Sequence, residues 1–212
     1  NASQEKNLLS LERLVLMASN ILKFYLNDKN YYSYSERLND LAWQNMRSQK
    51  VSQENKDAWF SLLIASITNS EEANNLVSLL QNKKIPNFIL DQDKRWQIIG
   101  ALATINHKKT NYFLQREKKK DQSDKGEKQI IKVEASLLKN KLKFWKIFVE
   151  GKNSLDSVRA GMQGFYLRKQ KNQIEKYIDL FFKDVTLIFT KKDRYYSKDF
   201  FDYLFPALFI NK

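Results

Sequence analysis

Residues that end or redirect secondary structure are scarce in this chain. Its 212 residues include only five glycines and two prolines. A β-sheet protein of this length needs many more turn residues to connect its strands. With 42% hydrophobic residues, the chain holds enough apolar material for one sizeable core or for a stack of helix pairs that share one. The composition therefore favours helices.

Apolar residues recur at helical spacing almost throughout the sequence, whereas the two-residue alternation typical of strands does not. We therefore predict an all-α protein with roughly eleven helices in antiparallel pairs, arranged as a HEAT-like, bowl-shaped superhelical array without a repeated sequence signature. Residues 3–212 are expected to form a single domain. The first two residues, Asn1 and Ala2, are interpreted as a remnant of tag removal.

Capping residues predict where several helices begin and end. Ser52, Asn69 and Ser154 precede helical runs, Asp91 and Asp93 occupy an N-cap and a first turn, and Gly151 is expected to stop a helix. Ser33 and Glu36 have the spacing of a capping box, which predicts a helix start after the polar run 27–30. The three lysines at 118–120 are predicted to lie in a solvated loop, and the polar stretch 118–128 is predicted to be a flexible point of the domain.

Few residues could carry catalysis. The single histidine, His107, is expected to lie at a helix end, and neither an HExxH motif nor a cysteine is present, so no metal ligands, catalytic residues or cofactor-binding residues are assigned. Gly161 and Gly164 resemble the GxxG of KH domains, but close helix packing explains them better. The acidic run 121–126 places Lys125 where a calcium loop requires an oxygen ligand. All four tryptophans are predicted to be core residues.

The formal net charge of +13 raises the question of a nucleic-acid partner. Most of the positive charge comes from lysines spread along the chain, whereas arginine is the residue that binds phosphates and guanines in a bidentate manner. We therefore expect no specific nucleic-acid partner. No run of 18 uncharged apolar residues exists, so no membrane partner is expected either. Together with the absence of cysteine, this favours a cytoplasmic protein.

Several blocks of the sequence, in the same order and at similar spacing, resemble the C-terminal helical domain of aminopeptidase N-type zinc metallopeptidases. LDQDKRWQIIGALATI (90–105) is similar to an aspartate-initiated helix with an Arg-Trp pair, here Arg95 and Trp96. Lys143 and Trp145 lie near the family's Lys and Trp, and Gly164-Phe165 matches its Gly-Phe pair. KYIDLFFKDVTLIF (176–189) resembles the family's aromatic long helix. Lysine, asparagine and isoleucine replace much of the family's alanine and arginine.

The resemblance implies a domain without catalysis of its own. Its parent would be a zinc aminopeptidase whose zinc lies in a separate catalytic domain, and this domain would cover that catalytic domain and limit the access of peptides. The implied partners are the catalytic domain of the same polypeptide and the peptide substrate. Arg95 and Arg159 are candidate peptide-facing residues, since a positive lining would attract a substrate's carboxylate. The alternative is a free-standing helical-repeat protein that binds nucleic acid or an acidic protein.

Overall fold

The computed structural model describes residues 7–210, which are helical and contain no strand. This confirms the all-α prediction. The chain divides into two compact units, one up to Ala101 and one from Leu102, and the division falls inside α5. The tag remnant proposed at residues 1–2 lies outside the described residues.

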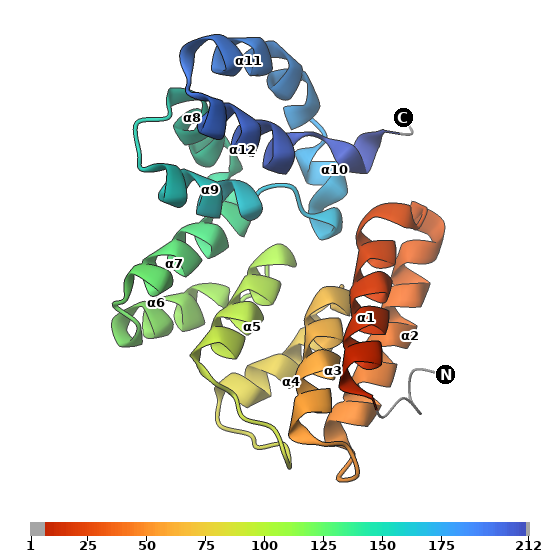
Figure 1. Ribbon diagram of the computed structural model, residues 1–212. Helices are drawn as coiled ribbons and strands as arrows, with labels where there is room; N and C mark the ends of the chain where they lie inside the picture. The colour runs from red at the N-terminus through yellow and green to blue at the C-terminus, as the bar shows by residue number, and fades with distance from the viewer. Residues whose placement is uncertain (1–6, 211–212) are drawn as a thin grey trace. The chain divides into compact units, whose positions relative to one another are not determined.

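The N-terminal unit contains four complete helices and most of a fifth (Figure 1). They are α1 (Leu8–Asn20), continued by a π-helical turn (Ile21–Tyr25), α2 (Asp28–Arg47), α3 (Gln53–Ser66), α4 (Ser70–Leu80) and α5 (Gln92–Thr104). Helix α3 packs against both α1 and α2. It is buried on several sides through Trp59, Phe60, Leu62 and Leu63, so it forms the centre of this unit.

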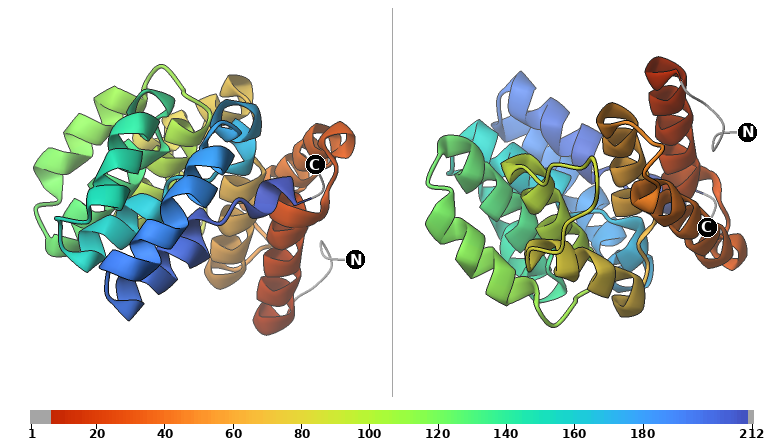
Figure 2. Two further views of the ribbon diagram at one scale, coloured as in Figure 1. Left: turned by 90° about the horizontal axis from the view of Figure 1, so that it is seen from above. Right: turned by 90° about the horizontal axis from the view of Figure 1, so that it is seen from below.

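The C-terminal unit contains the remaining helices, which Figure 2 shows from two further directions. They are α6 (Thr110–Lys120), α7 (Asp124–Ser136), α8 (Lys141–Glu150), α9 (Leu155–Gln163), α10 (Lys171–Ile174), α11 (Tyr177–Lys191) and α12 (Arg194–Leu204), with 3₁₀ turns at Leu138–Asn140, Arg168–Gln170 and Ala207–Phe209. Helix α9 packs against α7 and α12. It therefore occupies the middle of the unit.

An aromatic cluster forms much of the core of the C-terminal unit. The ring of Trp145 lies 5.6 Å from those of Phe165 and Tyr177 and 5.9 Å from that of Phe200, measured between centroids. Its indole nitrogen donates to Asp184 Oδ2 at 2.9 Å. All four tryptophans are buried, as predicted, at 7% exposure or less.

Most predicted helix boundaries are confirmed. The side chains of Ser52, Asn69 and Ser154 accept hydrogen bonds from backbone amides in the first turns of α3, α4 and α9. Asp91 likewise accepts from the amide of Lys94 at the start of α5. Gly151 ends α8 with φ of 57°, a left-handed conformation that glycine adopts without strain.

Two predictions from polar residues were wrong. Ser33 and Glu36 lie inside α2, because the side chain of Asn27 accepts from the amide of Asn30 and begins the helix earlier. The stretch 118–128 is mostly helical, and only residues 121–123 lie between α6 and α7. Lysines in the last turn of α6 interact favourably with the negative end of its dipole. A polar composition is therefore compatible with helix here.

Close packing explains the two glycines of the GMQG segment. A Cβ added to Gly161 would lie 2.9 Å from Phe148 Cε1, and one added to Gly164 would lie 2.2 Å from the carbonyl oxygen of Lys132 in α7. Both glycines are needed to let α9 approach its neighbours. This agrees with the packing interpretation of the sequence.

Candidate functional site: an acidic pocket of the N-terminal unit

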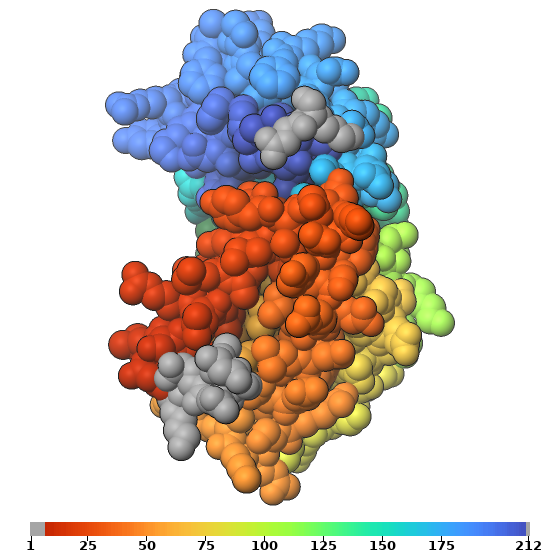
Figure 3. All heavy atoms as spheres, turned by 90° about the vertical axis from the view of Figure 1, so that its right-hand side faces the viewer, coloured from red at the N-terminus to blue at the C-terminus, as the bar shows by residue number. Residues whose placement is uncertain are grey.

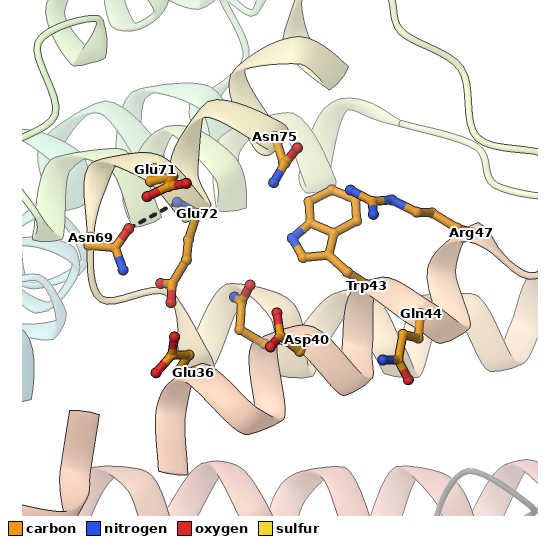
Figure 4. A pocket seen from close by; sticks show the side chains of 10 residues that line it. Glu36, Asp40, Trp43, Gln44, Arg47, Asn69, Glu71, Glu72 and Asn75 are labelled. Atoms are coloured by element: carbon orange, nitrogen blue, oxygen red, sulfur yellow. Dashed lines mark hydrogen bonds between the residues drawn. The ribbon is translucent and has the colours of Figure 1, made fainter. Parts of the chain in front are cut away.

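A pocket of about 380 Å³ opens between α2 and the first turns of α4 (Figure 4). This volume falls in the range of about 300–1,000 Å³ that small-ligand pockets occupy. Its lining is polar and contains four carboxylates and one guanidinium: Glu36, Asn39, Asp40, Trp43, Gln44, Arg47, Asn69, Glu71, Glu72 and Asn75. The pocket is therefore acidic in a chain whose net charge is strongly positive.

The spacing of residues within each helix brings these side chains together. Glu36, Asp40, Trp43 and Arg47 are three or four residues apart, so they lie along one face of α2. Glu71 and Glu72 lie in the first turn of α4, where the positive end of the helix dipole stabilises carboxylates. Residues of both helices line the pocket, so it receives acidic side chains from α2 and from α4.

The four carboxylates do not have the same role. Glu72 Oε2 accepts from the amide of Thr68 at 2.7 Å, and the amide of Glu72 donates to Asn69 Oδ1 at 3.0 Å. This reciprocal arrangement caps α4, so Glu72 has a structural function. Glu36, Asp40 and Glu71 are exposed, and none of them forms an ion pair or side-chain hydrogen bond with another residue of the 7–210 range.

Trp43 forms the apolar part of the pocket. Its side chain is only 7% exposed, and its indole nitrogen has no hydrogen-bond partner. In Figure 4 this nitrogen points towards the side of the pocket where the carboxylates lie. The guanidinium of Arg47 lies 5.1 Å from the ring centroid on the other side. A buried indole N–H without an acceptor costs free energy, so a ligand atom that accepted from Trp43 would relieve this cost.

Metal ligation was not predicted for this chain. Within residues 7–210, no three side chains of the His, Cys, Asp and Glu types are grouped in a way that could hold a metal ion. The same part of the chain contains no helix whose length and hydrophobicity would allow it to cross a membrane.

The two arginines predicted to face a peptide lie in different units. Arg95 is half-buried on α5, in the N-terminal unit, and Arg159 lies on α9, in the C-terminal unit. The prediction that they line one surface therefore stays a prediction.

His107 follows α5, as expected, and is buried. Burial and the neighbouring Lys108 and Lys109 lower the pKa of its imidazole, and its Nδ1 accepts from the amide of Lys109.

Arg159 has a structural role within its unit. Its Nε and Nη2 lie 2.8 and 2.7 Å from Asp199 Oδ2 on α12, and its Nη1 lies 3.2 Å from Asp156 on α9. Asp199 is only 9% exposed, so Arg159 compensates a largely buried carboxylate. The ion pair with Asp199 joins α9 to α12, whereas the pair with Asp156 lies within α9. Together they neutralise much of the positive charge that a substrate carboxylate would meet.

The sequence analysis did not identify the acidic pocket. The sequence predicts a helix after Asn69 and a core position for Trp43, and the structure confirms both. The three- and four-residue spacing from Glu36 to Arg47 could have indicated a functional face. The proximity of that face to α4 depends on tertiary packing, which the spacing does not contain.

No model of a known protein family matches this chain, and no curated protein matches it.

Proposed function

We propose that this chain is a non-catalytic accessory domain of an aminopeptidase N-type zinc metallopeptidase. In this proposal its helix pairs form part of a HEAT-like bowl that covers the catalytic domain of the same polypeptide and limits access to peptides. Zinc belongs to that catalytic domain. Arg95 and Arg159 remain the proposed peptide-facing residues.

The observation that carries the proposal is the apolar outer face of α1. Leu11, Val15 and Leu22 are buried on its inner side. On the other sides, large apolar residues are exposed over α1 and the π-helical turn: Leu9 (75%), Leu14 (41%), Leu16 (61%), Met17 (56%), Ile21 (44%), Phe24 (47%) and Tyr25 (79%). Figure 3 shows the atoms of this segment, in red, on the surface of the N-terminal unit.

An apolar groove accompanies this face. A hollow of about 820 Å³ lies between the π-helical turn and α2, lined mainly by apolar side chains such as Ile21, Leu22, Leu26 and Leu41. Exposed apolar surface of this extent is typical of interfaces between domains or proteins. A catalytic domain of the same polypeptide is the partner that the sequence resemblance implies.

Two of the residues that carry the resemblance, Trp145 and Phe165, are in contact in one aromatic core. The amine of the buried Lys141 donates to the carbonyl oxygens of Gly164 and Phe165 beside them. Lys143, which lies near the family's lysine in the sequence, is exposed.

The decisive experiment starts from the reading frame that encodes the chain. We expect several hundred upstream codons that include HExxH, and an intact protein that releases N-terminal residues from peptides in a zinc-dependent reaction. The 212-residue chain alone should hydrolyse no aminoacyl anilide. A start codon just before Ser3, or an upstream region without a zinc site, would refute the proposal.

A second experiment tests the role of the α1 face in the intact enzyme. Replacing Leu16 and Met17 by Glu should weaken the contact with the catalytic domain and make the linker between the two more sensitive to protease. Replacement of the exposed Glu12 by Gln, on the same helix, is the matched control. Unchanged protease sensitivity in the double variant would argue against this interface.

Replacement of Arg95 by Ala in the intact enzyme should raise KM for longer peptides more than for single-residue anilides, which are too short to reach this domain. Arg159 needs the conservative change to Lys, because removal of its charge would leave Asp199 without a partner. Equal effects on both substrate classes would remove the peptide-facing role from the proposal.

A further inference from the structure

We propose that the acidic pocket between α2 and α4 binds a lysine or arginine side chain of a peptide, and that a main-chain carbonyl oxygen of the same peptide accepts a hydrogen bond from the indole of Trp43. This inference does not depend on the parent enzyme proposed above. It concerns residues of the N-terminal unit alone.

Charge identifies the first part of the ligand. Glu36, Asp40 and Glu71 project from two helices into the pocket, and none has a cationic partner within the described part of the chain. Carboxylates that line one pocket without such a partner give it a negative potential. An ammonium or guanidinium group would be attracted to it and would form charge-assisted hydrogen bonds.

Trp43 identifies the second part of the ligand. Its indole N–H needs an acceptor, whereas a cation supplies only donors. The ligand must therefore carry an acceptor next to its cation, as a peptide does with its carbonyl oxygen. The indole nitrogen is buried, so the ligand must displace neighbouring side chains to reach it.

The pocket continues into a second hollow, and this favours an extended ligand. A cavity of about 220 Å³ shares Trp43, Arg47 and Asn75 with the acidic pocket. It continues along Leu79, Lys83, Lys84, Ile85 and Pro86. The surface thus changes from acidic through aromatic to apolar and basic. A peptide with a basic residue followed by apolar or acidic residues is complementary to this order, whereas a free amine would use only one end.

The test uses the full 212-residue chain labelled with ¹⁵N, in which the four tryptophans each give an indole N–H signal. The probes are three blocked peptides, Ac-Ala-Lys-Leu-Glu-NH₂ and its analogues with norleucine or glutamate in place of lysine. We expect the lysine peptide to shift the signal of Trp43 in a saturable manner while the signals of Trp59, Trp96 and Trp145 stay in place. Raising the salt concentration from 0.1 to 0.5 M should weaken the binding.

Two variants assign the binding to the pocket. Replacing Asp40 by Asn and Glu71 by Gln keeps the shape of the lining. The double variant should bind the lysine peptide about tenfold more weakly or worse, since the loss of one charge-assisted hydrogen bond alone can account for such a factor. The exposed pair Glu12→Gln and Glu54→Gln changes the net charge equally outside the pocket and should leave the affinity within about twofold. The Trp43→Phe variant should bind every lysine peptide more weakly. The loss of affinity should be smaller for a lysine ester than for the corresponding amide.

Several results would overturn the proposal. These are equal binding of the norleucine or glutamate analogue, a lysine peptide that leaves the Trp43 signal in place, and equal loss of affinity in the two charge-matched double variants. A Trp43 signal that shifts with protein concentration in the absence of peptide would instead identify a second copy of this lysine-rich chain as the occupant.

Discussion

At the residue scale, a few buried groups determine how closely the helices of the C-terminal unit approach one another. Gly164 faces the backbone of α7, and the amine of Lys141 reaches the carbonyl oxygens at the end of α9. A larger side chain at Gly164 would overlap with the backbone of α7, and Lys141 is buried. Their substitution is therefore expected to affect the free energy of unfolding more than substitutions on the surface.

Gly164→Ala should destabilise the protein by at least about 2 kcal/mol. The added Cβ would lie 2.2 Å from the carbonyl oxygen of Lys132, and relief of this overlap requires a shift of backbone. Gly100→Ala in α5 is the matched control, because its Cβ would meet nothing within 4 Å. Since alanine favours helix over glycine, this control should be neutral or stabilising by about 0.5–1 kcal/mol. Urea unfolding of both variants measures the difference.

Lys141 should make stability depend on pH in the alkaline range. Burial lowers the pKa of its amine from 10.5 to about 7. Between these two values the unfolded chain binds a proton that the folded chain does not, so the free energy of unfolding rises with pH from about 7 towards 10. Below pH 7 both states are protonated and this contribution no longer changes.

Replacing Lys141 by Met removes that titration and leaves the carbonyl oxygens of Gly164 and Phe165 without their donor. The variant should be less stable than the wild type at pH 9.5, and the difference should shrink as pH falls to 7. Lys146→Met is the control, an exposed change on the same helix. The difference in stability between this variant and the wild type should not depend on pH. Urea unfolding at pH 7, 8 and 9.5 gives the comparison, and a wild-type advantage that grows as pH falls would contradict the prediction.

At the scale of single elements, α1 differs from the other helices of its unit. One side of it is buried against α3, while much of the remaining surface is apolar and exposed. Helix α2, by contrast, presents charged side chains to solvent and contributes one wall of the acidic pocket. Two neighbouring helices thus offer two different surfaces, one suited to an apolar partner and the other to a cationic one.

Substitutions on α1 should distinguish the contributions of its two faces to the free energy of unfolding. Leu11→Ala, at a position with 0% exposure, should cost about 2–5 kcal/mol because it leaves a cavity in the core. The double change of Leu16 and Met17 to Glu should alter stability by no more than about 1 kcal/mol, since exposed positions contribute little. The same double variant should bind less of a hydrophobic dye. Large destabilisation by the double variant would show that the outer face belongs to the fold itself.

At the scale of the whole molecule, charge is unevenly distributed. The chain carries a formal net charge of +13, yet four carboxylates and one guanidinium line its acidic pocket. Several basic side chains form ion pairs within the fold. Arg159 pairs with Asp199, and Lys94 pairs with Asp57 and Asp91. The net charge is therefore a poor guide to the charge of the acidic pocket.

Binding to nucleic acid should accordingly be weak and independent of sequence. Lysines scattered over many helices can displace counterions from phosphates but do not form a surface that reads bases. Fluorescence anisotropy with two unrelated duplexes should give equal affinities that disappear at about 0.2 M salt. Selective binding that persists at that salt concentration would favour the alternative of a free-standing nucleic-acid-binding protein.

The sequence alone was sufficient for features that depend on neighbours along the chain. The helical spacing of apolar residues, the caps at Ser52, Asn69 and Ser154 and the stop at Gly151 all depend on interactions within about four residues, so they could be predicted. Even here, the predicted start of α2 at Ser33 was wrong, because the side chain of Asn27 caps the helix earlier.

The acidic pocket and the partners of Arg159 required the three-dimensional structure. Glu36 and Glu71 are separated by more than thirty residues, and Arg159 and Asp199 by forty. Their proximity follows from which helices pack together, and apolar periodicity shows only that each helix has a buried face, not which helix covers it. Which helices pair depends on the fit of whole surfaces. The charged residues of the pocket and of the Arg159–Asp199 pair therefore look alike in the sequence, and only the folded chain distinguishes a candidate site from a structural ion pair.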